Sequence, residues 1–314
     1  MEFEPNSNKS IYINKAGENW VVDRFRDEWK KYNNYSIPLT ISNNVKVIWL
    51  MAPWTWRKIS KSKLSKKIVI CTIHHIDEQK FDKKEKKEFL ERDKYVDYYH
   101  AISLNTEKQI KKLTTKKIFT IPFWLNNKIF FEISNKQVLR KKYEMNNDAY
   151  LVGSFQRDTE GKDLISPKLS KGPDLFINHI DKLINKEKNL EVVLTGKRRN
   201  YVINELSKRN IKYHYFEMIS FEQLNELYNL LDLYLVTSRY EGGPQAILEA
   251  GITKTPIIST DVGIAKEILS EESIIDLDNP LNARPNINYA FSNVQNYLIP
   301  KGFDKFNEMF SQIV

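Results

Sequence analysis

A stretch that reads T-S-R-Y-E-G-G-P-Q-A-I-L-E-A-G, residues 237–251, combines a Gly-Gly turn with two carboxylates. Glu241 precedes the turn, and Glu249 follows it with seven residues between the two. Carboxylate oxygens accept hydrogen bonds, so two of them in one crevice suit the hydroxyl groups of a sugar. These residue types therefore indicate a site for a sugar-containing ligand.

The turn itself favours an anion. A β-rich run at residues 231–236 leads into Gly242 and Gly243, which can take positive φ and let a ligand approach the backbone. Pro244 suits the first position of a helix, because its missing N–H is one that a helix start leaves unpaired in any case. The N–H groups and the positive dipole end of this helix would attract a diphosphate. The stretch thus predicts a nucleotide-sugar pocket.

Two cations upstream fit the same pocket. The sequence G-S-F-Q-R-D at residues 153–158 ends an expected strand, so Arg157 would emerge at the edge where ligands bind. The sequence K-G-P-D at residues 171–174 opens the next helix and places the ammonium group of Lys171 beside a helix N-terminus. Arginine suits a bidentate phosphate contact, and lysine supplies a compact charge. Both cations therefore point to a diphosphate ligand.

Strands and helices alternate along the chain, which predicts parallel, doubly wound sheets. We expect strands at residues 11–14, 37–41, 45–50, 67–73, 98–103, 118–122, 150–155, 191–195, 211–216, 231–236, 256–260 and 273–277. Helices are expected at residues 20–32, 84–93, 106–113, 173–186, 202–209, 221–230 and 264–269.

The predicted fold class is α/β, with two Rossmann-like doubly wound domains that face each other across a cleft. Ligands would bind there, at the carboxyl ends of the strands. Residues 1–125 would form the acceptor-side domain and residues 126–149 a linker. Residues 150–290 would bind the nucleotide sugar, and residues 291–314 would form a helical tail able to pack back on the first domain.

Composition limits the class of protein. The chain has 314 residues with 41% hydrophobic content, enough for two globular domains. Its net charge of +9 indicates anionic partners or a lysine-rich solvated surface. The single cysteine, Cys71, excludes an internal disulfide framework and fits a reducing compartment. We see no signal pattern in residues 1–10, and the apolar run at 45–56 is too short to span a bilayer. We therefore expect a cytoplasmic protein, with peripheral membrane contact as an option.

The order of G-x-F-x-R-D, K-G-P-D, T-G and S-R-Y-E-G-G-P-Q-A-I-L-E-A-G resembles the donor domain of family 4 retaining glycosyltransferases, which have the GT-B fold. The match covers residues 151–269 well and the whole chain in pattern. The resemblance implies a UDP- or GDP-sugar donor, no permanently bound cofactor and no metal, because cations do the work of a divalent ion.

The resemblance also implies roles for the residues of the site. Arg157 and Lys171 would bind the donor diphosphate and stabilise the leaving group. Glu241 would contact the transferred sugar, and Glu249 would bind the ribose diol. Backbone amides of Gly243, Gln245 and Ala246 would hold the distal phosphate, and Gly242 and Pro244 of the same turn would also contact the donor.

One loop departs from the family pattern. Residues 159–170 form a longer connection than is usual there. It contains Lys162 and Lys168, which leaves open whether one of them takes the place of Lys171.

The first half resembles the family more loosely. An expected strand ends in H-H-I-D, where the family often has a histidine near the transferred sugar. His74 fits that catalytic position best, His75 is the alternative, and a purely structural histidine is about as common. The turn A-G-E-N at residues 16–19 resembles the family's N-terminal glycine loop and implies a donor contact for Gly17. Ser103 would face the cleft.

Two further patterns have ordinary explanations. The sequence D-L-D at residues 276–278 spells a metal motif of another glycosyltransferase fold, but it lies past the donor site and is attributed to chance. The sequence W-T-W-R-K at residues 54–58, followed by lysines 61, 63, 66 and 67, mixes aromatics with cations. That mixture suits anionic lipid or a sugar acceptor, and an exposed loop is the alternative.

The predicted function is transfer of a sugar from a nucleotide-diphosphate sugar to a saccharide or lipid-linked acceptor, with retention of configuration. Front-side attack is expected, and the role would be surface polysaccharide or glycolipid synthesis. Two alternatives stay open: another GT-B enzyme such as a nucleotide-sugar epimerase, and a non-enzymatic nucleotide or nucleic-acid binder. The latter ranks low, because nucleic-acid binding needs no paired glutamates beside a Gly-Gly turn, so no nucleic-acid partner is expected.

Overall fold

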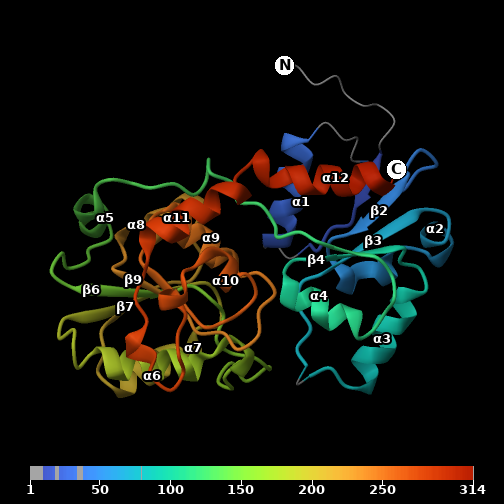
Figure 1. The fold of residues 1–314 in the computed structure, drawn as a ribbon. Helices are drawn as coiled ribbons and strands as arrows, with labels where there is room; N and C mark the ends of the chain where they lie inside the picture. The colour runs from blue at the N-terminus through green and yellow to red at the C-terminus, as the bar shows by residue number, and fades with distance from the viewer. Residues whose placement is uncertain (1–9, 18–20, 34–37, 79, 314) are drawn as a thin grey trace. The chain divides into compact units, whose positions relative to one another are not determined.

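The computed structural model describes residues 10–17, 21–33, 38–78 and 80–313, which divide into two compact units (Figure 1). Unit 1 contains the described residues up to Trp124 and those from Pro300 onward. Unit 2 is Leu125–Ile299. Each unit has a parallel five-stranded sheet with flanking helices, which confirms the predicted α/β fold class.

The sheet of unit 1 has its strands in chain order, β1-β2-β3-β4-β5, all parallel. Its strands are β1 (Ile11–Ile13), β2 (Val47–Leu50), β3 (Ile68–Ile73), β4 (Tyr98–Ala101) and β5 (Ile118–Thr120). Its helices are α1 (Val21–Tyr32), η1 (Pro53–Lys58), α2 (Lys61–Leu64), α3 (Lys83–Asp93), α4 (Leu104–Lys111), η6 (Lys301–Phe303) and α12 (Asp304–Ile313). The strand expected at 37–41 is wrong for residues 38–41, which form no strand, and residue 37 lies outside the described residues.

An aromatic cluster ties the C-terminal tail into unit 1. Phe306 of α12 lies between Trp29 and Trp49, with ring centroids 5.9 and 5.5 Å away. Trp124 stacks edge-on against Phe303 at 4.6 Å. These rings are almost fully buried. The tail therefore supplies core side chains to unit 1, and it starts at residue 300 rather than at the predicted residue 291.

Residues 126–149, expected to be a linker, are instead part of unit 2. They contain α5 (Lys136–Lys142), which packs against α8 (Phe221–Leu230). The buried guanidinium of Arg140 donates to the Leu230 carbonyl at 3.0 Å and forms an ion pair with Asp232 at 2.5 Å. Arg140 therefore fastens this segment to the residues just before β9.

The sheet of unit 2 has the order β10-β9-β6-β7-β8, again all parallel. Its strands are β6 (Tyr150–Ser154), β7 (Leu190–Thr195), β8 (Tyr213–Phe216), β9 (Leu233–Val236) and β10 (Ile257–Ser259). Its further helices are η2 (Leu169–Lys171), α6 (Pro173–Leu183), α7 (Asn200–Lys208), α9 (Gln245–Ile252), α10 (Ala265–Ile268), η3 (Glu271–Ser273), η4 (Pro280–Asn282), α11 (Ile287–Val294) and η5 (Gln295–Tyr297).

The strand expected at residues 273–277 is wrong. This segment starts in η3, and only Ile274 forms a single bridge, to Ser259 at the end of β10. The strand order reverses between β6 and β9, the two neighbours in the middle of the sheet. In open α/β sheets, ligands bind outside the carboxyl ends of the strands at such a reversal.

Buried histidines in both units are held neutral. In unit 1, His100 donates from Nε2 to the Ile121 carbonyl at 2.6 Å, so Nδ1 accepts from the Thr72 hydroxyl at 2.9 Å. Burial lowers the pKa of His100 to about 3. In unit 2, His179 on α6 is 3% exposed, and burial lowers its pKa to about 4. Protonation of either imidazole therefore opposes folding.

We expect the free energy of unfolding to fall as the pH drops from about 6.5 to about 4. The folded pKa of His179 lies below the ordinary value, so the unfolded chain binds the proton more readily over this range. The contribution of His179 is roughly 3 kcal/mol. Urea unfolding at several pH values should show a flatter pH dependence for His179→Leu, and an unchanged pH slope in that variant would contradict the assignment.

Candidate active site

The predicted site residues of unit 2 gather where the strand order of its sheet reverses. Arg157 follows the end of β6, and residues 237–243 follow the end of β9, the parallel neighbour of β6. Lys171 lies at the end of η2, directly before α6. Three segments from different parts of the sequence therefore reach the same edge of the sheet.

Arg157 lies beside a second arginine that the motif analysis missed. Its Nε donates to the Thr159 carbonyl at 2.7 Å. Burial lowers the pKa of Arg157, and the neighbouring positive charge of Arg198 lowers it further. Within the part of the chain that the structure describes, neither guanidinium forms an ion pair. Like charges held together in this way favour an incoming anion.

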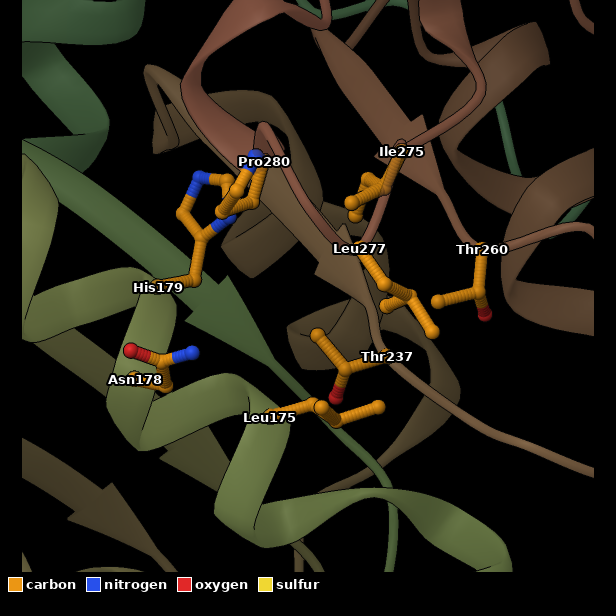
Figure 2. Close-up of a pocket in the computed structure, with 8 residues that line it drawn as sticks. All are labelled: Leu175, Asn178, His179, Thr237, Thr260, Ile275, Leu277 and Pro280. Atoms are coloured by element: carbon orange, nitrogen blue, oxygen red, sulfur yellow. The ribbon is translucent and has the colours of Figure 1, made fainter.

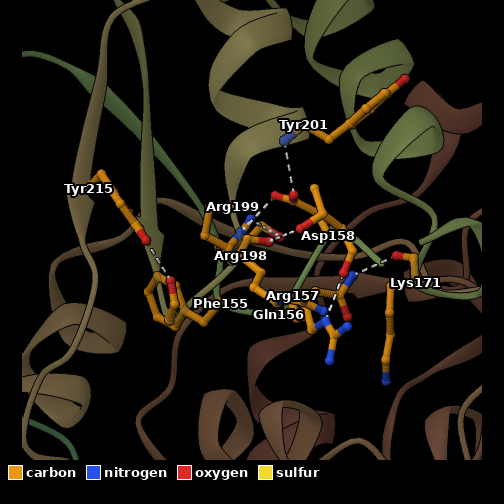
Figure 3. A network of polar contacts seen from close by, with 12 residues as sticks. Phe155, Gln156, Arg157, Asp158, Lys171, Arg198, Arg199, Tyr201 and Tyr215 are labelled. Atoms are coloured by element: carbon orange, nitrogen blue, oxygen red, sulfur yellow. Dashed lines mark hydrogen bonds and ion pairs between the residues drawn. The ribbon is translucent and has the colours of Figure 1, made fainter. Parts of the chain in front are cut away.

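The backbone around Arg198 fixes this arrangement. The Arg198 carbonyl accepts from the backbone N–H groups of Asp158 and Thr159, at 3.1 and 3.3 Å. Its guanidinium donates to the Gly161 carbonyl at 2.6 Å. Figure 3 shows the charged ends of Arg157 and Lys171 pointing in the same direction. Arg198 follows β7 in the run T-G-K-R-R, and this cluster of cations after a strand is the signal that could have found it.

Lys171 and Glu241 are brought into direct contact as an ion pair. The Ser238 hydroxyl lies 3.1 Å from the same Glu241 oxygen and 3.0 Å from Gln156 Oε1. Gln156 in turn donates from Nε2 to the Lys171 carbonyl at 2.9 Å. Two residues predicted to be catalytic thus share one polar network, which sets the direction of both side chains.

The corner that carries Lys171 is locked onto the exit of β9. Gly172 has φ of 60°, and a Cβ there would come within 1.8 Å of the Thr237 carbonyl oxygen. The Ser170 carbonyl accepts from the backbone N–H groups of Arg239 and Tyr240, at 2.9 and 3.1 Å. Arg239 also forms a two-pronged ion pair with Asp174, at 2.7 and 2.6 Å. Lys171 is therefore positioned by backbone packing.

The Gly-Gly turn differs from the prediction in its backbone. Neither Gly242 nor Gly243 has positive φ, which several neighbouring glycines do adopt. The close packing at this turn requires glycine at position 263, where an added Cβ would lie 2.5 Å from the Gly242 carbonyl oxygen. Pro244 is the N-cap, with φ −63° and ψ 114°, so the helix begins one residue later, at Gln245. Ala246 follows in the first turn of α9, where the amino end of the helix faces the turn.

Glu249 is buried in the second turn of α9, with 6% of its surface exposed. Its Oε2 accepts a hydrogen bond from the phenol of Tyr228 at 3.0 Å. Tyr228 is itself buried against Phe155 and Tyr234, with ring centroids 4.9 and 5.1 Å away. Sequence patterns did not identify Tyr228, because the contact joins α8 to α9 and depends on the tertiary fold.

The extended loop at residues 159–170 contains Lys162 and Lys168. It folds back on itself through a bridge between Thr159 and Pro167, and the Lys168 backbone donates to the Asp158 carbonyl at 2.8 Å. Lys162 is exposed. Lys171 forms the ion pair with Glu241, and its role in donor binding stays a prediction.

His74 and His75 differ in burial in unit 1. Nε2 of His74 donates to the Met51 carbonyl at 2.8 Å, and its ring stacks on Phe123 with centroids 5.9 Å apart. Burial lowers the pKa of His74 to about 4, so the ring is neutral and Nδ1 carries a lone pair. His75 is exposed.

The other predicted residues of unit 1 have structural roles. Gly17 has φ of 77°, and its N–H donates to Asp23 Oδ1 at 3.2 Å. Glu18 and Asn19 of the same turn lie outside the described residues. The expectation that Ser103 faces the cleft is wrong, because Ser103 is fully buried and its hydroxyl caps α4 at the backbone N–H of Thr106.

A small cavity lies beside the site in unit 2 (Figure 2). It is lined by side chains that include His179, Thr237 and Thr260. Its volume is about 10 Å³, room for about one water molecule and far too small for a nucleotide. Among the residues that the structure describes, no cluster of three or more His, Cys, Asp or Glu is arranged to hold a metal ion.

We expect Gly172→Ala to destabilise the protein by roughly 3 kcal/mol, since the added methyl meets a backbone carbonyl at a positive-φ position. Gly17→Ala is a matched control: φ is also positive, but nothing lies within 4 Å of its Cβ. The control should lose about 1 kcal/mol. Equal losses for the two variants in urea unfolding would show that the contact between Gly172 and Thr237 is unimportant.

Comparison with known proteins agrees with this geometry. Residues 165–289 match the family model described as Glycosyl transferases group 1. The structure is similar to sucrose-phosphate synthase from Thermosynechococcus elongatus, with TM-score 0.67 and 15% identity over 93% of this chain and 77% of that one. It is also similar to Anabaena HepE in complex with UDP and glucose, with TM-score 0.73 and 11% identity over 97% of this chain and 99% of that one.

A glycosyltransferase from Rickettsia africae gives TM-score 0.71 and 16% identity over 98% of this chain and 99% of that one. No curated protein matches by sequence. At these identities the solved structures show the fold, and the segment matched by the family model contains Lys171, Glu241 and Glu249 but not Arg157. The chain has the GT-B fold, and its residues 165–289 match the glycosyl transferases group 1.

Proposed function

We propose that the protein is a retaining family 4 glycosyltransferase that moves a sugar from a UDP- or GDP-sugar to a saccharide or lipid-linked acceptor. The observation that carries this proposal is the cation cluster at the strand reversal of unit 2. Arg157 and Arg198 lie together without an ion pair among the described residues, and Lys171 points the same way as Arg157. Such a site suits a diphosphate that gains negative charge as the sugar leaves.

The leaving group would be stabilised by Arg157 and Lys171, with Arg198 as an added source of positive potential. We propose that these cations supply the charge that a divalent ion supplies elsewhere. The backbone amides of Gly243, Gln245 and Ala246 at the start of α9 would hold the distal phosphate. The diphosphate oxygen would then accept the proton of the attacking hydroxyl, as front-side attack requires.

Two carboxylates would orient the rest of the donor. Glu241 is proposed to contact the transferred sugar while its pairing with Lys171 couples sugar position to phosphate position. Glu249 is proposed to bind the ribose diol, and the Tyr228 phenol would hold its carboxylate in place. Buried carboxylates with such partners lose little freedom when a hydroxyl donor arrives.

His74 is proposed to contact the transferred sugar. Since Nε2 donates to Met51, Nδ1 is the atom that would accept a hydroxyl proton in a hydrogen bond. With its pKa lowered to about 4 by burial, His74 would stay neutral and act by orientation, not by charge. Gly17 and His75 stay proposed donor contacts of the same unit.

The donor base and cellular role are also proposals. HepE was solved with UDP and glucose, which makes UDP-glucose the first donor to test here. We propose a role in surface polysaccharide or glycolipid synthesis, with the protein in the cytoplasm and peripherally bound to an anionic membrane. No helix in the described residues is long and apolar enough to cross a membrane.

Arg157→Ala should weaken UDP binding about 10- to 100-fold, the usual range for losing a charge-assisted hydrogen bond to phosphate. Isothermal titration with UDP measures it. Arg284→Ala is the matched control, because Arg284 is an exposed arginine of unit 2 that also donates to backbone carbonyls. An unchanged UDP dissociation constant in Arg157→Ala would rule out its phosphate role.

Glu241→Gln should abolish sugar transfer and leave UDP binding within about threefold of wild type, since the amide removes a charge near the sugar but no phosphate contact. The measurements are UDP titration and UDP release from UDP-glucose with and without added saccharide acceptors. Undiminished turnover in the variant would remove Glu241 from the mechanism. Sugar conversion without any acceptor would favour an epimerase instead.

A further inference from the structure

Helix α3 of unit 1 presents one strongly basic face. Lysines 83, 86 and 87 of the helix and its C-cap residue Lys94 are exposed and surround Leu90, which is 42% exposed. These side chains and Glu91 line an open hollow of about 480 Å³. The spacing of three, four, seven and eleven residues from Lys83 places them on one side of the helix. None of the four ammonium groups forms an ion pair with another described residue.

The acidic residues of α3 are largely neutralised by other elements. Arg57 of η1 forms ion pairs with both Glu88 and Glu91, at 2.5 and 2.7 Å. Asp93 accepts from the Tyr99 phenol at 2.8 Å and pairs with Lys116 at 3.5 Å. The remaining acid, Glu85, lies in the first turn. The helix surface therefore keeps an excess of positive charge that the fold does not use.

We propose that this face of α3 binds the surface of an anionic phospholipid bilayer. Four lysines spread over about 16 Å of helix match a plane of headgroups better than a single small anion. Leu90 in their midst adds an apolar side chain that can reach the acyl boundary while the lysines remain among the phosphates. Trp54 is half exposed and would add an aromatic side chain to the bilayer contact. It lies on η1, the helix whose Arg57 forms an ion pair with Glu88 of α3.

The charge alone would also suit a nucleic acid, but the side chains do not. The aromatic ring of the helix, Phe89, is buried, so the face offers no ring on which a base could stack. An exposed leucine gains nothing from a phosphate backbone and gains burial at a membrane. The inference rests on the proposed function only in that a membrane-bound acceptor would need such a contact.

The sequence pattern indicated membrane contact near residues 54–67 and named other residues. Trp56 is buried and donates to Glu88, and Arg57 is held by the two glutamates, so neither is available to a bilayer. Those two residues instead brace α3. Trp54 and lysines 58, 61, 63 and 66 of this stretch are exposed, so the contact predicted there stays a prediction beside the one proposed for α3.

The test is co-sedimentation with vesicles of phosphatidylcholine, with and without phosphatidylglycerol. Wild type should bind only the anionic vesicles, less at high salt. The variant K83Q/K86Q/K87Q/K94Q should lose on the order of 100-fold in affinity, since each lysine near the surface contributes several-fold. A matched control, K141Q/K186Q/K188Q/K305Q, removes four exposed lysines elsewhere and should bind nearly as wild type.

Leu90→Ser should weaken binding to the anionic vesicles several-fold, whereas Val138→Ser, an equally simple change at an exposed apolar residue of α5, should not. Equal losses in the two lysine variants would overturn the proposal, because total charge and not α3 would govern binding. So would tight binding of an oligonucleotide with no vesicle binding. UDP titration of all variants distinguishes the two proposals. If the proposed UDP site is wrong, the variants will not bind UDP, but their binding to vesicles still tests the α3 surface.

Discussion

The site depends on the close contact between Gly172 and the carbonyl of Thr237. This contact joins the start of α6 to the end of β9, two segments 65 residues apart in the chain. Only a glycine fits, because φ is positive and a methyl group would overlap the oxygen. This contact fixes the backbone next to Lys171, and the fixed backbone lets the Lys171 ammonium reach Glu241. The Arg239–Asp174 ion pair further stabilises the turn before α6, whose backbone position the Gly172–Thr237 contact already fixes.

A buried ion pair of unit 2 organises the opposite side. Arg199 and Asp158 are fully buried, 2.9 Å apart, and Arg199 also donates to the Thr195 carbonyl at 3.0 Å. Breaking such a pair leaves an uncompensated charge, so it fixes the residues next to it in the sequence. Those residues are Arg157 and Arg198. One well-satisfied pair therefore holds two repelling guanidiniums together, which no isolated loop would do.

The sequence predicted the parts of the site that local motifs carry. Arg157, Lys171 and Glu241 lie in short runs with fixed spacing, and the alternation of strands and helices predicted both sheets. Arg198 and Tyr228 were missed because their partners come from other elements. The strand at 273–277 and the linker at 126–149 failed for a related reason. Both were predicted from local pattern, whereas pairing with β10 or with Asp232 depends on the assembled unit.

Net charge shows the same limit. A net charge of +9 fits a diphosphate site, a membrane-binding surface or a soluble, lysine-rich surface. Composition does not show which of the cations serve which role. The structure separates two kinds of cation. Arg157 and Arg198 are partly buried and held close, so their repulsion is relieved by one compact anion. The lysines of α3 are exposed and spread along a helix, where screening is strong and only an extended anionic surface would engage them together. Salt should therefore weaken the second interaction far more than the first.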